Sequence, residues 1–416
     1  MNKLVKLLSF ITLILLFAAC DKVNEKDFVH TRIPIFEKMA SIRADEISVL
    51  PAKSLHTSGK IYIYEDYLFI NEPLEGIHIF DNSNPANPKA VSFVKIPGNV
   101  DMAIKDNTLY ADSYVDLLTF DLSNPSKPNL MDREKDVFQS LYIYGFQLGR
   151  DDNRVVVGYK DTLMRYDQVN TYNPFYSGKD MVYLNLSSSE AGSTYGQGGS
   201  MARFTLAQEY LYAVDASTLH LFDVHETANP RFVKNISLGW GIETIFPHKD
   251  KLFIGSNTGM FIYDIANASN PVQLARYNHV RACDPVVVND THAFVTLRTG
   301  AICAGTENVL EVLDIRDLKN PLLVKSYQMQ NPHGLALAGN VLYLCEGKYG
   351  FKSFNATDVL QIGENRLEHL QNLNSTDVIP GPKSLIVIGE DGVCQYDYSN
   401  KSKLKLLSCI SRNIER

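Results

Sequence analysis

The stretch that decides the fold reads Gly76-Ile77-His78-Ile79-Phe80-Asp81-Asn82-Ser83-Asn84-Pro85. A short apolar run ends in an aromatic residue and an aspartate, and Asn, Ser and Pro follow, which favour a reversal of the chain. The same design returns at Leu117-Leu118-Thr119-Phe120-Asp121-Leu122-Ser123-Asn124-Pro125. The two aspartates lie 40 residues apart. Self-similarity at such a spacing indicates a repeat architecture.

Eight marks of this kind occur along the chain, each an apolar run that ends in Asp or Asn. They are Phe80-Asp81, Phe120-Asp121, Tyr166-Asp167, Phe222-Asp223, Tyr263-Asp264, Leu313-Asp314, Phe354-Asn355 and Tyr396-Asp397, spaced 40 to 56 residues apart. A proline follows seven residues after the Asp in six of the eight units. We expect each Asp to be a structural turn residue whose carboxylate accepts backbone N–H bonds.

Each unit reads as short strands separated by turns, for example 102–104, 108–111 and 117–120. Four strands in a period of about 40 residues are typical of a propeller blade, so we predict an all-β protein with one β-propeller over residues 57–416. Eight marks predict eight blades, with seven as the alternative because the third unit is the least regular. Their expected starts are Lys60, Asp101, Gln139, Arg203, Thr244, Asp284, His333 and Asp377.

The composition of the units narrows the kind of propeller. Trp240 is the only tryptophan, which excludes blades that each carry a Trp mark, and the paired glycines of kelch blades are missing. The sequence apolar strand, Asp, any residue, Ser, Asn, Pro resembles the LVIVD repeat family, over about residues 59 to 410. This resemblance implies a scaffold in an envelope or surface protein, and it implies no particular reaction.

The N-terminus has the features of a lipoprotein signal. Lys3 and Lys6 precede an apolar run at 7–17 that is too short to span a bilayer, and Phe17-Ala18-Ala19-Cys20 resembles a lipobox. We therefore expect residues 1–19 to be removed and Cys20 to carry lipid. Residues 20–56 would form a polar tether and a short element, about 36–46, that packs on the propeller. The expected location is the cell envelope, at the outer membrane or the cell surface.

Charge and motifs exclude several function classes. The chain has 40 Lys and Arg against 47 Asp and Glu, and loss of Lys3 and Lys6 leaves 38 − 47 = −9. No basic run with interleaved aromatics occurs, which argues against nucleic acid. The sequence holds no Gly-x-Ser-x-Gly, His-Glu-x-x-His or P-loop motif, and it indicates no cofactor.

Aligned blades place one polar residue of each inner strand near the mouth of the central channel. This set is Lys60, Asp101, Arg203, Glu243 or Thr244, Asp284, His333 and Asp377. Such a ring could bind a polar ligand or a cation, whereas the competing interpretation is that its members pair across neighbouring blades. The irregular loops 185–199 and 298–308 fall at the same end, and the Asp-to-Pro turns fall at the other.

The cysteines and two histidines suggest structural roles. Cys283, Cys303 and Cys345 should lie at the same end of adjacent blades, with Cys283–Cys303 as the preferred disulfide and zinc less favoured. His78 and His220 occupy equivalent positions, three residues before the Asp, and packing explains them better than metal ligation.

Two function classes remain. The first is a lipid-anchored scaffold that binds an envelope or extracellular protein or a glycan. The second is a hydrolase or lyase with its site in the funnel of the channel. The lack of a catalytic motif favours the first, although a fold alone does not determine a function.

Overall fold

The structure is a computed structural model that describes residues 28–45, 47–138, 140–143, 146–149, 153–165, 197–278, 285–299 and 307–413. The chain divides into two compact units, residues 1–36 with 158–178 and residues 37–157 with 179–416. Strands β1 (Phe28–Lys38) and β13 (Arg154–Arg165) pair as a two-stranded sheet, and β11 (Ser140–Ile143) pairs with β12 (Phe146–Gly149). The propeller belongs to the larger unit.

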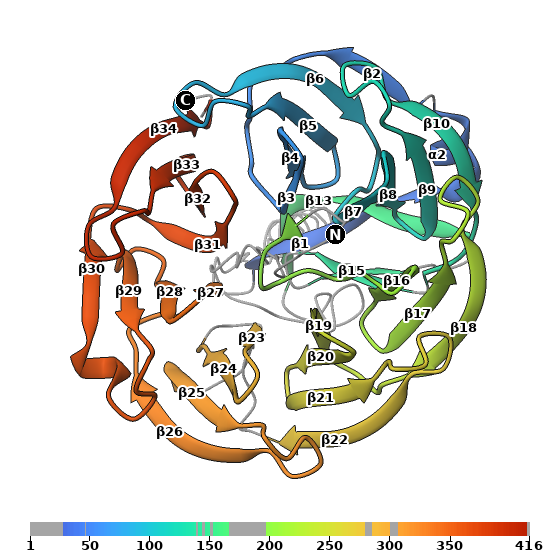
Figure 1. The fold of residues 1–416 in the computed structure, drawn as a ribbon. Coiled ribbons are helices and arrows are strands. Elements are labelled where there is room, and N and C mark those ends of the chain that lie inside the picture. Colours follow the sequence, from blue (N-terminus) through green and yellow to red (C-terminus); the bar gives the residue numbers. More distant parts are fainter. Residues whose placement is uncertain are drawn as a thin grey trace, which may run out of the picture. The chain divides into compact units, whose positions relative to one another are not determined.

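Seven four-stranded blades form a ring in this unit, and their strands follow one another from the axis outward (Figure 1). Blades 1 and 2 are β3 (Ile61–Tyr64), β4 (Tyr67–Glu72), β5 (Gly76–Asp81), β6 (Lys89–Lys95) and β7 (Met102–Lys105), β8 (Thr108–Ser113), β9 (Asp116–Asp121), β10 (Asn129–Glu134). Blades 3 and 4 are β15 (Phe204–Ala207), β16 (Tyr210–Val214), β17 (Thr218–Asp223), β18 (Arg231–Ser237) and β19 (Ile242–His248), β20 (Lys251–Ser256), β21 (Gly259–Asp264), β22 (Val272–Asn278).

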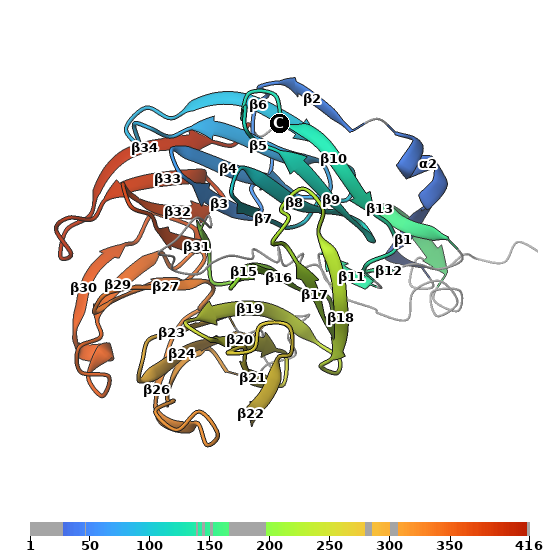
Figure 2. The same ribbon diagram turned by 45° about the vertical axis from the view of Figure 1, so that its right-hand side comes forward.

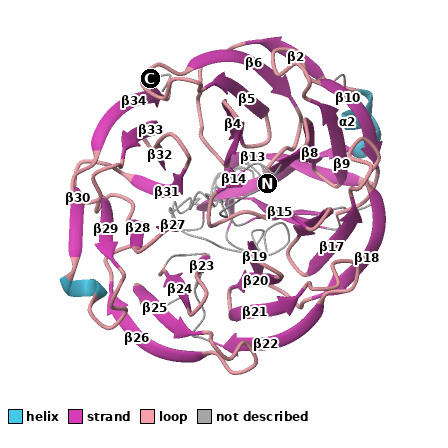
Figure 3. Ribbon diagram, viewed as in Figure 1, coloured by secondary structure: helices cyan, strands magenta, loops and turns pink. Residues whose placement is uncertain are grey.

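The remaining blades repeat the same antiparallel order, and strands account for almost all of the regular structure (Figure 3). Blade 5 is β23 (Val286–Val288), β24 (His292–Leu297), β25 (Val309–Asp314) and β26 (Leu322–Gln328). Blade 6 is β27 (Leu335–Ala338), β28 (Val341–Cys345), β29 (Phe351–Asn355) and β30 (Arg366–Leu370), with the 3₁₀ turn η2 (Ile362–Glu364). Blade 7 is β31 (Ser375–Pro380), β32 (Leu385–Gly389), β33 (Gly392–Asp397) and β34 (Lys405–Ser411).

The predicted count of eight blades is wrong, and the alternative of seven is correct. Asp101, before the inner strand of blade 2, accepts hydrogen bonds from the backbone N–H groups of Arg203 and Phe204 at 2.6 and 3.1 Å. The inner strands that begin at 101 and 203 are therefore direct neighbours, which leaves no place in the ring for a blade between them. The mark at Tyr166-Asp167 lies outside the described residues.

The repeated Asp or Asn closes the same turn in every blade, as the sequence predicted. Its Oδ1 accepts the backbone N–H of the second residue after it, at 2.8 to 3.0 Å. The seven residues are Asp81, Asp121, Asp223, Asp264, Asp314, Asn355 and Asp397. Because this bond joins residues only two apart, the local sequence is enough to specify the turn.

Each pair of outer strands also shifts register at the residue before this Asp or Asn. The shift falls, for example, between Ile79 and Phe80 in blade 1 and between Gln395 and Tyr396 in blade 7. It recurs in the five other blades. A bulge increases the local twist of a strand, which disfavours pairing with a strand of another chain. The repeated bulge therefore disfavours edge-to-edge association through the exposed outer strands.

The hydrophobic core lies between neighbouring blades. One cluster joins Phe69 and Ile77 of blade 1, Leu109 of blade 2 and Phe204 and Leu211 of blade 3. Strands such as β8 and β9 are buried along almost their whole length, because both faces of a middle blade pack against other blades. Burial of these faces is the main source of stability in the ring.

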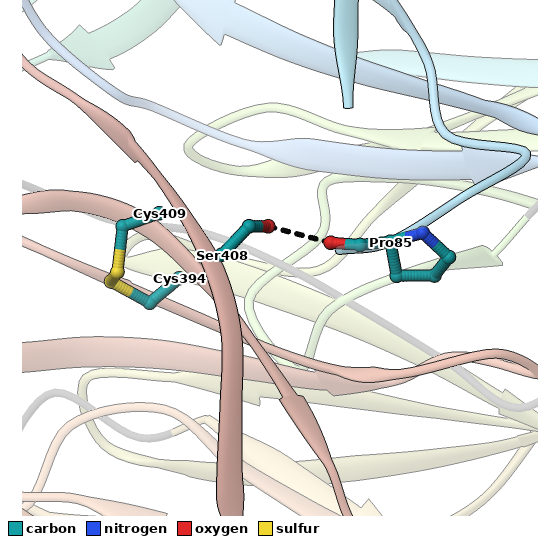
Figure 4. The surroundings of a disulfide bond; sticks show 4 residues. All are labelled: Pro85, Cys394, Ser408 and Cys409. Atoms are coloured by element: carbon teal, nitrogen blue, oxygen red, sulfur yellow. Dashed lines mark hydrogen bonds between the residues drawn. A yellow bond between two sulfur atoms is a disulfide. The ribbon is translucent and has the colours of Figure 1, made fainter. Parts of the chain in front are cut away.

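Hydrogen bonds of both side chains and backbone close the ring between blades 7 and 1. Asn82 and Gln395 exchange two amide hydrogen bonds at 3.0 and 2.7 Å. Ser408 Oγ donates to the carbonyl of Pro85 at 2.6 Å (Figure 4), and the N–H of Asn413 donates to Leu55 at 2.7 Å. Blade 1 also carries β2 (Ser48–Pro51) on its outer edge, seen beside β6 in Figure 2.

A short helix, α2 (Met39–Ala44), lies within the stretch expected to form a packed element. Met39 and Ile42 are buried against Tyr114, Val115 and Val155. Arg43 on the same helix binds both carboxylate oxygens of Asp116, at 2.9 and 2.6 Å. In the part of the chain that the structure describes, no helix has the length and apolarity needed to cross a membrane.

Candidate functional site at the channel mouth

The structure places the predicted ring of polar residues at one end of the inner strands. Lys60, Asp101 and Arg203 each directly precede an inner strand, and Glu243, His333 and Asp377 lie at or near the start of theirs. Asp284 lies outside the described residues. The alternative position, Thr244, is buried beside Glu243.

Lys60 and Asp101 form an ion pair between blades 1 and 2, and each side chain is 3% exposed. Asp101 Oδ1 also accepts the N–H of Met102 at 2.7 Å. Together with its bonds to Arg203 and Phe204, this carboxylate connects three blades. The competing interpretation of the sequence, pairing across neighbouring blades, therefore describes this part of the ring.

Asp112, near the end of β8, holds the backbone before the inner strand of blade 2 in place. Its Oδ1 accepts the N–H groups of Val100 and Asp101 at 2.7 and 3.0 Å and the Asn99 amide at 2.8 Å. Burial raises the pKa of the Asp112 carboxyl and lowers the pKa of the Lys60 ammonium. Both shifts reflect the cost of a charge in a low-dielectric site. The attraction between Lys60 and Asp101 offsets this cost for Lys60 only in part.

Acidic and basic residues alternate around the ring. From blade 7 to blade 5 the order is Asp377, Lys60, Asp101, Arg203, Glu243 and Arg298. Burial lowers the pKa of Arg203 and of Arg298, while attraction to neighbouring carboxylates opposes this: Asp101 and Glu243 for Arg203, Glu243 for Arg298. In this arrangement the opposite charges on adjacent blades attract and offset one another.

Arg298 completes the ring although it does not belong to an inner strand. It follows β24, the second strand of blade 5, and its side chain lies close enough to His333 to act on it electrostatically. Burial, assisted by this arginine, holds the pKa of His333 well below its ordinary value, so the imidazole is neutral. An alignment of inner strands alone could not identify Arg298 as a ring residue. The sequence feature that could have identified it is a charged residue directly after the second strand of a blade.

A segment that the sequence assigned to an irregular loop lies inside the channel. Strand β14 (Gln197–Gly198) pairs with β3 on the axis side of blade 1. Ser200 Oγ then accepts the N–H of Leu335 in blade 6 at 3.0 Å and donates to Asp377 of blade 7 at 3.5 Å. We call residues 197–202 the strap. Because it bonds to three blades, the end of the 185–199 loop is part of the core and is not a free binding loop.

Burial raises the pKa of Asp377 well above its ordinary value, although the Val378 N–H, Ser200 and Lys60 oppose the shift. The side chain of Asp377 is fully buried, and the strap lies against it. It is placed to hold the strap rather than to bind a cation.

His78 and His220 form buried pairs with carboxylates. His78 Nε2 lies 2.9 Å from Glu72, and His220 Nε2 lies 2.9 Å from Asp215. The hydrogen bonds of His78 and Lys53 outweigh burial and hold the pKa of Glu72 at about 2. Both histidines thus have structural partners on the preceding strand or directly after it.

The described residues contain a disulfide that the sequence did not predict, and they do not include the preferred pair Cys283–Cys303. Cys394 and Cys409 face each other across β33 and β34 and are bonded (Figure 4). Cys345 is a buried free thiol. Cys20, Cys283 and Cys303 lie outside the described residues.

The family model of the LVIVD repeat matches residues 57–95, 99–135 and 251–279. These ranges cover blades 1 and 2 and the outer three strands of blade 4. The chain is an LVIVD-repeat β-propeller. The less regular blades of this LVIVD propeller keep the Asp or Asn turn, so the structural repeat extends beyond the ranges matched by sequence.

Solved structures with the same architecture share very little sequence with the LVIVD propeller. The periplasmic gluconolactonase PpgL of Pseudomonas aeruginosa is 11% identical, with a TM-score of 0.53 over 86% of this chain and 97% of that one. The computationally designed Ika8 protein is 10% identical, with a TM-score of 0.51 over 88% and 92%. The comparison with curated proteins found no match. These similarities support the fold alone.

Proposed function

We propose that this protein is an exported lipoprotein, held at the cell envelope by lipid on Cys20, whose propeller binds an envelope or extracellular protein or glycan. Binding takes place at the end that carries the channel mouth and the irregular loops. The main support is the contrast between the two ends. One end repeats the same Asp or Asn turn seven times, and the other carries connections that differ from blade to blade. Variable loops on a rigid scaffold are where binding usually resides.

The disulfide supports the exported location. Bonds such as Cys394–Cys409 form and persist in oxidising compartments and are rare in the cytosol. Lipid on Cys20 would add membrane affinity of about 0.8 kcal/mol for each buried methylene, and stable anchoring uses more than one chain.

The hydrolase or lyase alternative has less support. General acid–base catalysis needs a carboxylate within reach of substrate. In the described part of the ring, Asp101 is engaged by Lys60 and by three backbone N–H groups, and Asp377 is covered by the strap. These carboxylates serve the scaffold.

A photo-crosslinking amino acid placed at matched exposed positions tests the binding end in intact cells. Glu75 and Tyr349 lie on connections at the irregular end, and Ala86 and Ser126 lie in the Asp turns at the other end. We expect adducts from the first pair and none from the second. Adducts confined to Ala86 and Ser126, or absent from all four positions, would contradict the proposal.

A further inference from the structure

The alternation of charge around the channel mouth is interrupted between blades 5 and 7. Arg298 of blade 5 is followed by His333 of blade 6, where the alternation would place a carboxylate, and only then by Asp377 of blade 7. Arg298 and His333 are both buried, and the lowered pKa of His333 leaves its imidazole neutral. In the described part of the ring, blades 5 and 6 therefore present a cation beside a neutral side chain.

Strand β24 brings Arg298 to the same junction as His333. Thr296 Oγ1 on this strand donates to the carbonyl of His333 at 2.7 Å. Arg298 forms a β-bridge two residues later, so its side chain lies on the same face as that of Thr296. It also acts electrostatically on His333. Both side chains thus face the junction of blades 5 and 6, which are neighbours in the ring (Figure 1).

The hydrogen bond of His333 determines which ring nitrogen carries the proton. Its Nε2 lies 3.0 Å from the amide nitrogen of Asn331. An amide nitrogen donates, so Nε2 accepts, and the neutral ring carries its proton on Nδ1. Nδ1 is buried and has no hydrogen-bond partner among the described residues. Gly347 permits this arrangement, because a Cβ there would lie 2.8 Å from the Asn331 amide nitrogen and 3.1 Å from Nε2.

The guanidinium of Arg298 is a second donor of this kind. Burial lowers its pKa and attraction to Glu243 raises it, and among the described residues no hydrogen bond contributes. Glu243 also attracts Arg203, so two buried guanidinium groups share this carboxylate. Buried polar groups without hydrogen bonds are unfavourable. Because Arg298 and the Nδ1–H of His333 both donate, neither can satisfy the other, whereas one anionic acceptor would satisfy both.

We propose that the junction of blades 5 and 6 at the channel mouth binds the carboxylate of a ligand, which accepts hydrogen bonds from Arg298 and from Nδ1 of His333. This inference rests on the proposed function and names the ligand chemistry at the same end. A carboxylate matches the planar guanidinium with two parallel hydrogen bonds. Glu243 disfavours a second negative charge nearby, so a carboxylate fits better than a doubly charged phosphate.

Calorimetry measures binding of two carboxylates and their neutral counterparts to the acyl-free mature protein, in a buffer without carboxylate. Glucuronate is compared with glucose, and N-acetylalanine with its amide, so the two arms separate a uronic acid from a peptide carboxyl end as the source. We expect saturable binding of at least one carboxylate and none of its neutral counterpart.

Two substitutions and a control locate the binding site. Arg298→Leu should weaken binding by more than about tenfold, and His333→Leu by about tenfold. Arg298→Lys keeps the charge without the planar fork, so its affinity should be intermediate, and it serves as the test if Arg298→Leu does not fold. Arg276→Leu is the matched control, since Arg276 is exposed and donates to Thr258 Oγ1 at 2.9 Å.

Binding of neither carboxylate, equal binding of the neutral counterparts, or unchanged affinity of the Arg298 variants would overturn the carboxylate assignment. Binding that appears only after Asp284→Asn would also overturn it, because a carboxylate of the chain itself would then be the acceptor. Cross-links from Glu75 or Tyr349 in these cases would leave the scaffold function standing, and loss of both signals would remove both proposals. A melting temperature of each variant close to that of the parent protein ensures that lost binding reflects the site.

Discussion

Lys60 and Asp101 form an ion pair across the junction of blades 1 and 2, with both side chains 3% exposed. The same carboxylate binds backbone N–H groups at the entry to blade 3. A pair that had looked like part of a ligand site is thus a junction between blades. A buried charge that loses its partner is strongly unfavourable, so this relationship has measurable consequences.

Lys60→Met should lower the free energy of unfolding by about 3 kcal/mol, because Asp101 is left buried without a counter-charge. Asp101→Leu should lower it further, since Met102, Arg203 and Phe204 would also lose their acceptor. Urea unfolding measures both. Arg231→Ala, which removes an exposed pair with Glu226, is the control and should change stability by less than about 0.5 kcal/mol. Equal effects of all three substitutions would refute a junction role.

The Asp turns should make the propeller sensitive to acid. Hydrogen bonds from Arg316 to Asp314, from Ser123 to Asp121 and from the Ser399 N–H to Asp397 lower the pKa of each carboxyl. A carboxyl with a lowered folded pKa stabilises the protein above its unfolded pKa of about 3.9, and this stabilisation is lost as the pH falls through the folded pKa.

Replacement of these three aspartates by Asn should keep the turns, because blade 6 uses Asn355 in the same role. We expect stability near that of the parent at neutral pH and a smaller loss of stability between about pH 4 and pH 2. The matching Ala replacements should be less stable at every pH. Thermal melts across this range distinguish the outcomes, and an Asn variant with an unchanged acid profile would rule out the turn carboxylates as the cause.

The disulfide should stabilise the last blade. The Cys394–Cys409 bond closes a loop with a sequence separation of 15, which corresponds to about 3 kcal/mol in the chain-entropy treatment. Paired replacement of both cysteines by Ala should lower stability by up to this amount. The hydrogen bond from Ser408 to Pro85 lies next to Cys409, so hydrogen exchange should rise at the junction of blades 7 and 1. If the urea midpoint and the hydrogen exchange of the double Ala variant equal those of the parent protein, then β33 and β34 remain paired equally well without the disulfide.

The strap should depend on Ser200. Ser200→Ala removes the acceptor of the buried Leu335 N–H and a donor to Asp377, and such unsatisfied groups cost about 1–3 kcal/mol. Ser402→Ala, at an exposed turn position, serves as the control. Calorimetric melting should show a lower midpoint for the strap variant only. If Ser200→Ala melts at the same temperature as the parent protein, the hydrogen bonds of Ser200 in the strap do not stabilise the ring.

The proposed lipid anchor depends on Cys20. Cys20→Ser should move the protein from the membrane fraction to the soluble fraction, because the acyl chains that bind the bilayer would be lost. Metabolic labelling with a fatty-acid analogue should be lost in the same variant. Retention of Cys20→Ser in the membrane fraction would contradict lipidation as the means of attachment.

The sequence by itself determined the repeat, the four-stranded blade and the role of the Asp or Asn turn. These features depend on neighbours: Asp121 meets Ser123 two residues later, and the proline follows at a constant offset. These short-range interactions occur in every repeat, so they can be recognised from the sequence alone. It also placed six of the ring residues at the start of their inner strands.

Only the tertiary structure decided how the copies meet. Whether the unit near Tyr166 joined the ring depended on Asp101 meeting Arg203, more than 100 residues away. The strap beside β3, Arg298 near His333 and Cys394 opposite Cys409 likewise depend on strand register and on which blades become neighbours. The physical reason is that burial between blades is non-directional and selects partners only when the whole ring closes, whereas a turn is specified by hydrogen bonds within a few residues.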